Sequence, residues 1–177
     1  MKVNIILGKF QPLTRAHVRL IEELYNQNNC KVVIVLTCCK NKDERHPFSQ
    51  DLILKEIFKC YTSGDLVFDI VLHSGGDFGP LFEKFYKYGY EPQLWGCGTD
   101  RVEAYRKFIK NPKYIEMFHL PENFDVYELK RNDEDISSTK VRQFIKDNDF
   151  ENFKEMMPSQ SWQFFEEFKK ELDMVSN

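Results

Sequence analysis

A turn near the N-terminus brings together side chains that can bind an anion. The sequence GKFQPLTRAH occupies residues 8–17 and follows directly on the apolar run VNIIL. Gly8 lets a ligand approach the backbone closely, and Lys9 adds a full positive charge. Thr14 is a candidate N-cap of the following helix, with His17 at its third position. Because helix N-termini carry unpaired amide N–H groups, this turn predicts a phosphate site. The alternative is a capped helix with a buried histidine.

A second stretch with the same chemistry lies far along the chain. The sequence ISSTKVR occupies residues 136–142 and places three hydroxyl residues at an expected helix start. Lys140 and Arg142 follow within the first turns, where cations oppose the helix dipole. A bound polyanion would remove that conflict. The alternative is a serine-capped surface helix whose charges are solvated.

The segments that must position these residues alternate between apolar runs typical of strands and amphipathic stretches typical of helices. Two β-branched apolar runs predict strands buried on both faces, at 3–7 and 31–37, and two further strands are predicted at 66–73 and 92–98. Four amphipathic segments predict helices, at 15–27, 49–61, 78–89 and 100–110. Weaker strand candidates occupy 114–120 and 124–130. The alternation predicts an α/β fold with a parallel sheet and right-handed crossovers. Ligands bind beyond the carboxyl ends of such strands, where the turn at 8–17 lies.

After about residue 136 the pattern becomes wholly helical. Three helices are expected in succession, at 137–148, 150–157 and 161–175. No linker precedes them, so we expect a single domain over 1–177, with an α/β core (1–136) and C-terminal helices (137–177). The aromatic residues of the last segment are expected in the core or at a subunit contact, which leaves room for a homo-oligomer.

Composition, net charge and cysteine content exclude several classes of protein. The chain has 177 residues, 42% apolar and 30% charged, with a net charge of -3. This balance is ordinary for a soluble protein and predicts no nucleic-acid partner. No apolar run approaches the ~20 residues of a membrane span, and no signal peptide is apparent. The five cysteines form no C-x-x-C pair. They are expected to be reduced thiols in a cytoplasmic protein, without a zinc site.

Taken together, the two stretches resemble the signatures of a known family. GKFQPLTRAH resembles the G-R-F-Q-P-x-H-x-G-H motif, or its T-x-G-H form, of the nucleotidylyltransferase superfamily. ISSTKVR resembles that superfamily's I-S-x-T-x-x-R motif, and WGCGTDR (95–101) resembles the strand-end G-x-D segment between them. The Phe10-Gln11-Pro12 core is similar to that of the archaeal-type nicotinamide-mononucleotide adenylyltransferases.

The resemblance implies a Rossmann-like parallel sheet with helices on both faces. It also implies transfer of AMP from ATP to a phosphate monoester with release of pyrophosphate, most directly to nicotinamide mononucleotide to give NAD. Such a transfer depends on positioning and charge neutralisation. Mg²⁺ would be held by phosphate oxygens and water, so no cluster of protein ligands for a metal is expected.

The resemblance also assigns roles to individual residues. The implied catalytic residues, which would contact the triphosphate, are Lys9, Thr14, His17 and Arg142. The implied nucleotide-binding residues are Gly8, Phe10, Gln11, Gly96, Gly98, Asp100, Ile136, Ser137, Ser138 and Thr139.

A further set of residues is predicted to bind the acceptor substrate. Arg45, with His46 and Lys40, could bind the acceptor's phosphate. Trp95 could stack on a base, with a core position as the alternative. Phe48 could pack under the acceptor or only against the helix that follows it. Asp77 could contact a sugar or amide.

Three departures from the motif keep other functions open. Lys9 replaces an arginine, Thr14 the commoner histidine, and Ala16 a glycine. The same chemistry with a different acceptor, such as a phosphopantetheine-like, sugar or alcohol phosphate, is one alternative. CTP as donor is another. A non-catalytic nucleotide-binding regulator on the same fold is a third.

Overall fold

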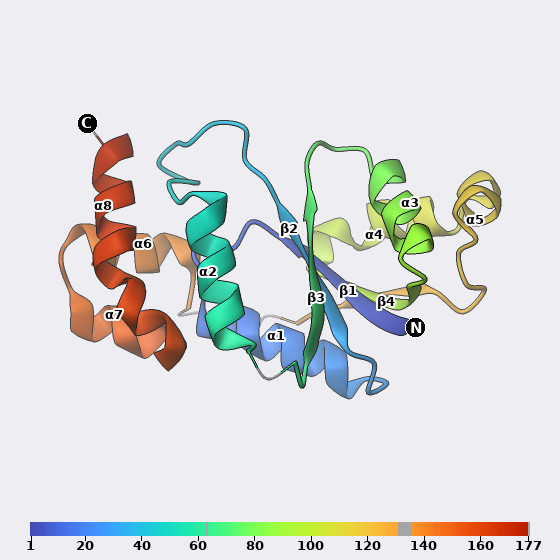
Figure 1. The fold of residues 1–177 in the computed structure, drawn as a ribbon, viewed down its shortest axis with the longest axis horizontal. Coiled ribbons are helices and arrows are strands. Elements are labelled where there is room, and N and C mark those ends of the chain that lie inside the picture. The colour runs from blue at the N-terminus through green and yellow to red at the C-terminus, as the bar shows by residue number, and fades with distance from the viewer. Residues whose placement is uncertain (63, 131–135, 177) are drawn as a thin grey trace. The chain divides into compact units, whose positions relative to one another are not determined.

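The computed structural model describes residues 1–62, 64–130 and 136–176 and shows an α/β fold (Figure 1). The strands are β1 (Lys2–Gly8), β2 (Val32–Thr37), β3 (Val67–His73), β4 (Glu91–Cys97) and β5 (Asp125–Glu128). They form one parallel sheet in the order β3-β2-β1-β4-β5. The expected α/β class and parallel sheet are therefore confirmed.

Helices connect the strands and continue after the last one. Between the strands lie α1 (Arg15–Asn26), α2 (Gln50–Cys60), α3 (Gly79–Lys87), α4 (Thr99–Ile109) and α5 (Pro112–Phe118). After β5 come α6 (Ser138–Lys146), α7 (Phe150–Met156), the 3₁₀ helix η1 (Ser159–Phe164) and α8 (Phe165–Val175). The C-terminal helices are confirmed. Among the described residues, none of the helices combines the length and apolarity that a membrane span requires.

The chain divides into two compact units, each built from three segments. The first comprises Met1–Gly8, Leu20–Thr37 and Asp65–Arg131. The second comprises Lys9–Arg19, Cys38–Gly64 and Asn132–Asn177. The single domain expected from the sequence stays a prediction, and each unit is described by itself.

The first unit contains the sheet, with helices on both of its faces. Val3 and Ile5 of β1 belong to a core that includes Phe82 of α3 and residues of α4. Asn4 points to the opposite face, because successive side chains of a strand alternate. There its amide donates to the Leu24 carbonyl of α1 (3.1 Å).

The sheet has its topological switch point beside β1. The connections lead from β1 to β2 on one side, and β4 pairs with β1 on the other. Ligands of open α/β sheets bind outside the carboxyl ends of the strands at such a point. β1 ends there at Gly8, and loop 9–14 follows it in the chain.

The second unit has an aromatic core of its own. α6 packs against α7 and α8 (Figure 1), and α2 packs against η1, the 3₁₀ helix before α8. Phe168 of α8 is fully buried and contacts Phe48, with their ring centroids 4.7 Å apart. Phe153 and Phe165 complete this cluster at 4.9 Å. The phenylalanines of the last segment are thus core residues, one of the two expected positions.

One strand expectation was wrong. Residues 114–120 lie mostly in the helix α5. Asn111 caps this helix by accepting a hydrogen bond from the Lys113 amide (3.0 Å), and a proline follows it at the first helical position. His119 then ends the helix in a left-handed conformation (φ 52°). An Asn-Pro start is a helix signal that outweighs the short apolar pattern.

Candidate phosphate-binding site

Loop 9–14, which belongs to the second unit, is held in place by hydrogen bonds and packing within that unit. The Gln11 amide donates to the Phe48 carbonyl (3.2 Å) and accepts from the Phe48 N–H (2.9 Å). Phe10 adopts a left-handed backbone (φ 50°), which is uncommon for a bulky residue. Its buried ring meets His17 edge-on, with centroids 5.1 Å apart. Packing and paired hydrogen bonds therefore fix a strained loop.

Thr14 and His17 form a reciprocal cap at the start of α1. The His17 amide donates to Thr14 Oγ1 (3.4 Å), and the Thr14 amide donates to His17 Nδ1 (3.0 Å). The imidazole thus fills the place of Glu or Gln in a capping box. Because Nδ1 accepts from an amide, the neutral ring carries its hydrogen on Nε2. The N-cap predicted at Thr14 is confirmed.

The start of α6 repeats the arrangement with hydroxyl groups. Ser137 caps the helix by accepting from the Lys140 amide (3.2 Å). Arg142, one turn further on, donates from Nη2 to Thr139 Oγ1 (3.3 Å). Thr139, the second residue of the helix, is exposed. This helix start can bind an anion.

Two hydrogen bonds connect the start of α6 to loop 9–14. Arg142 Nη1 donates to the Gln11 carbonyl (2.8 Å). Ser138 Oγ donates to the Pro12 carbonyl (3.3 Å). The two sequence motifs, more than a hundred residues apart in the chain, therefore meet within the second unit.

An open pocket of about 750 Å³ lies at this junction. Its lining residues are Lys9, Phe10, Gln11, Glu44, Arg45, His46, Ser138, Thr139, Arg142, Gln143, Lys146, Leu172 and Ser176. Four permanent cations and one histidine face a single carboxylate in this set. The pocket suits a ligand with several negative charges.

The ionisable groups of the pocket influence one another. Burial lowers the pKa of His46, and the nearby charges of Lys9 and Arg142 lower it further. Asp43 opposes this effect from 3.2 Å, where its Oδ1 accepts from His46 Nδ1. Burial also lowers the pKa of Arg142. His46 is therefore neutral at neutral pH, and a bound anion would draw a proton onto it.

Most predicted residues of the second unit meet here. The predicted residues that line the pocket are Lys9, Phe10, Gln11, Arg45, Ser138, Thr139 and Arg142. Ile136 and Ser137 immediately precede Ser138 in the chain. Thr14 and His17 stand at the start of α1, and the His17 ring contacts Phe10. Phe48 is 3% exposed and packs on Phe168 of α8, and its expected role toward an acceptor stays a prediction.

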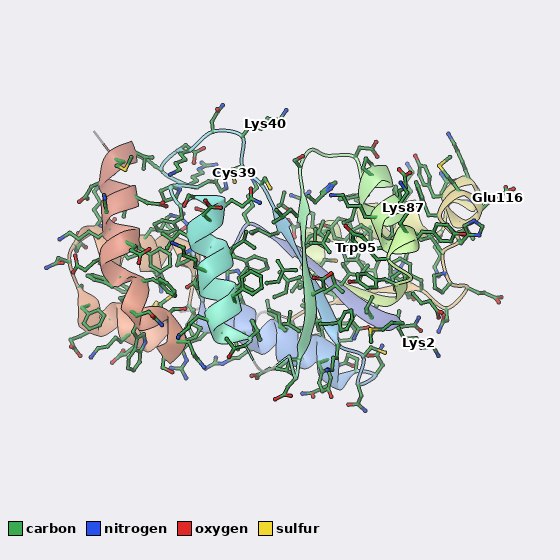
Figure 2. All side chains as sticks on the ribbon, viewed as in Figure 1. Lys2, Cys39, Lys40, Lys87, Trp95 and Glu116 are labelled. Atoms are coloured by element: carbon green, nitrogen blue, oxygen red, sulfur yellow. The ribbon has the colours of Figure 1, made fainter. Side chains whose placement is uncertain are left out.

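The remaining predicted residues lie in the first unit. Trp95 is fully buried and stacks on Tyr105 at 3.9 Å between centroids, so it takes the core position left open above (Figure 2). A side chain at Gly96 would meet Leu24 at 2.9 Å and Leu129 at 3.0 Å. Gly96 is thus required by the packing of α1 and the end of β5 against β4.

Three further predicted positions act at helix starts. Gly98 is the N-cap of α4, and exposed Asp100 lies in the first turn of that helix. Asp77 accepts a hydrogen bond from the Gly79 amide at the start of α3 (2.9 Å). Gly8 ends β1, in register with Leu36 of β2. The ligand roles of these four residues stay predictions.

Sequence reasoning missed three residues around the pocket. Lys146 follows Arg142 by one helical turn, so the helical repeat could have revealed it. Leu172 reaches the pocket from α8, which no local pattern signals. Glu56 is a fully buried carboxyl that accepts from the Leu13 amide (2.9 Å). Its only sequence signal is a glutamate within the apolar stripe of α2.

The fold is that of solved nucleotidylyltransferase structures. The solved structures similar to this chain include a bifunctional NMN adenylyltransferase/ADP-ribose pyrophosphatase from Francisella tularensis, complexed with AMP and a Mn ion. It has a TM-score of 0.63 and 15% identity, over 99% of this chain and 52% of that chain. The chain thus spans about half of the Francisella protein.

Two further structures have the same fold. Plasmodium falciparum nicotinic acid mononucleotide adenylyltransferase, complexed with NaAD, gives a TM-score of 0.64 at 15% identity, over 96% of this chain and 97% of that chain. Thermotoga maritima TmcAL, bound with alpha-thio ATP, gives 0.59 at 12% identity, over 97% and 56%. The family model of the citrate lyase ligase C-terminal domain matches residues 104–165. No curated protein matches the chain.

Proposed function

We propose that this chain is a nucleotidylyltransferase that transfers AMP from ATP to a phosphate monoester, with nicotinamide mononucleotide as the leading acceptor and NAD as the product. One observation carries the proposal. Arg142 bonds both the Gln11 carbonyl and Thr139, and so assembles the two motifs around a cationic pocket. The nucleotidylyltransferase fold supports it.

The chemistry follows from the charges of the pocket. An oxygen of the acceptor phosphate attacks the α-phosphorus of ATP in line, and the bond from that phosphorus to the β-bridging oxygen breaks. Negative charge then grows on the departing pyrophosphate. Lys9, Arg142 and the first amides of α6 neutralise it, together with the N–H of His17. Mg²⁺, held by phosphate oxygens and water, would supply further charge neutralisation.

The acceptor needs no protein base, because a phosphate monoester is largely dianionic at neutral pH. Arg45 and His46 stand together on the pocket wall and suit the acceptor's phosphate. The same arrangement accommodates a phosphopantetheine-like, sugar or alcohol phosphate, and CTP as donor is a variant of the same reaction. A regulator would bind ATP without turnover.

The test is pyrophosphate release from purified protein with Mg-ATP, with and without nicotinamide mononucleotide. Release that depends on the mononucleotide supports both chemistry and acceptor. Release only with another phosphate monoester, or only with CTP, keeps the chemistry and replaces the substrate. ATP binding with no turnover under any acceptor favours the regulator and contradicts the proposal.

Two variants of His17 separate chemistry from folding. His17→Gln keeps a side-chain acceptor for the Thr14 amide, since glutamine is a normal capping-box residue, but it removes the imidazole. His17→Ala removes both. We expect each variant to lose about a hundredfold or more in kcat, the usual cost of deleting one charge-stabilising donor. Only His17→Ala should also lose stability in urea unfolding. Turnover unchanged in His17→Gln would exclude a catalytic role for this histidine.

A further inference from the structure

Glu56 is a buried carboxyl group attached to the candidate phosphate-binding loop. It lies on α2, is 0% exposed, and its Oε1 accepts from the Leu13 amide at 2.9 Å. Leu13 directly precedes Thr14, whose amide bonds His17. The Gln11–Phe48 hydrogen bonds hold the same loop just before α2. Besides its bonds to the start of α6, the loop is therefore attached to Phe48 and to Glu56, and Glu56 is the attachment next to the capping box.

The surroundings of this carboxyl group favour its protonated form. The groups that face it are the Leu13 amide, the Ser161 hydroxyl of η1 and the Cys60 thiol of α2. Burial raises the pKa of Glu56 to about 8, although the hydrogen bonds of Leu13 and Ser161 lower it. Among the described atoms, none is a hydrogen-bond partner of Oε2. A charge here would be poorly compensated, so its formation should draw water or a counter-ion between α2 and the loop.

We propose that Glu56 is a positioning residue whose neutral carboxyl group holds loop 9–14 and the Thr14–His17 cap in the arrangement that binds a triphosphate, and that its ionisation at alkaline pH releases this loop. The inference rests on the proposed function for the ligand. The attachment of the loop by Glu56 is independent of it and can be tested alone.

The first measurement is the affinity for Mg-ATP by calorimetry between pH 7 and 9. Wild type should lose about tenfold in affinity over this range, the size of one perturbed ionisation. Glu56→Gln keeps the acceptor oxygen and cannot ionise, so its affinity should match that of wild type at pH 7 and stay constant. Glu56→Ala should bind weakly throughout. Asp51→Asn, an exposed carboxylate on the same helix, is the matched control and should behave like wild type. An equal alkaline loss in Glu56→Gln would overturn the proposal.

The second measurement needs no ligand. Amide hydrogen exchange, corrected for its intrinsic pH dependence, should be faster over residues 9–14 in wild type at pH 9 than at pH 7. Glu56→Gln should show no such difference. Exchange that is identical in the two proteins at both pH values would contradict the proposal, even where Glu56→Ala fails to fold. If Mg-ATP does not bind at any pH but exchange responds as expected, the proposed function fails and the positioning role stands.

Discussion

At the scale of single residues, one guanidinium group joins the two halves of the candidate site. Arg142 makes two directed hydrogen bonds, to Gln11 and Thr139, from a half-buried position. Its planar fork allows both bonds at once while keeping a fixed charge beside the pocket. Lys9, in contrast, is exposed and acts as a point charge. The hydrogen-bond geometry of this site therefore depends on Arg142, whereas Lys9 contributes charge alone.

Replacing Arg142 by lysine tests this distinction. The charge is preserved, but an ammonium group cannot serve both acceptors with the same geometry. We expect Mg-ATP to bind about tenfold more weakly, because one charged hydrogen bond is lost. Calorimetry measures this directly. The control is Arg15→Lys, which alters an exposed arginine with one bond to a backbone carbonyl, and equal effects of the two substitutions would contradict the role of the fork.

At the scale of elements, the C-terminal helix secures the start of α2. Glu171 of α8 accepts from the Ser49 amide (2.6 Å) and from its hydroxyl (2.7 Å). Ser49 in turn caps α2 by accepting from the Leu52 amide (3.2 Å). One carboxylate thus completes the cap of a helix that lies 122 residues away in sequence. Leu172, the next residue of α8, lines the pocket.

Glu171→Ala should therefore destabilise the protein by about 2 kcal/mol, because it leaves two donors of Ser49 without their charged acceptor. Glu167→Ala removes an exposed carboxylate from the same helix and should change stability by no more than about 0.5 kcal/mol. Urea unfolding of the two variants measures the difference. Equal midpoints and slopes would show that the α8 contact with Ser49 is energetically negligible.

At the scale of the whole molecule, stability should decline with pH because of Glu56. Its pKa rises from 4.5 to about 8 on folding, so the folded state binds more protons than the unfolded state between these values. Stability then falls as pH rises through this range. The histidines whose pKa values are lowered, His46 and His73, act mainly below pH 6.5. The raised thiol pKa of Cys60 acts mainly above pH 9.

Between pH 7 and 8.5 Glu56 is therefore the dominant contribution. Wild type should lose about 1 kcal/mol of unfolding free energy over this interval, and Glu56→Gln should lose almost none. Denaturant unfolding at the two pH values gives the comparison. A decline of the same size in both proteins would assign the pH dependence to other groups.

The sequence alone determined the fold class and both halves of the candidate site. Long β-branched runs alternating with amphipathic segments predict parallel strands and helices, because each pattern matches one backbone repeat. GKFQPLTRAH and ISSTKVR contain helix starts, hydroxyls and cations in fixed local spacing, so phosphate binding can be predicted for them without a structure. The weak apolar pattern at 114–120 wrongly predicted a strand, because the Asn111 cap starts a helix there.

Only the tertiary structure decided which of these residues meet. The bonds from Arg142 and Ser138 to loop 9–14 span more than 120 residues, and no local pattern encodes such pairings. The burial of individual side chains could not be predicted from the sequence either, because it depends on every neighbour in space. It placed Trp95 in a core and enclosed the carboxyl group of Glu56. Local periodicity determines elements and caps, whereas long-range packing determines pockets, buried charges and their pKa values.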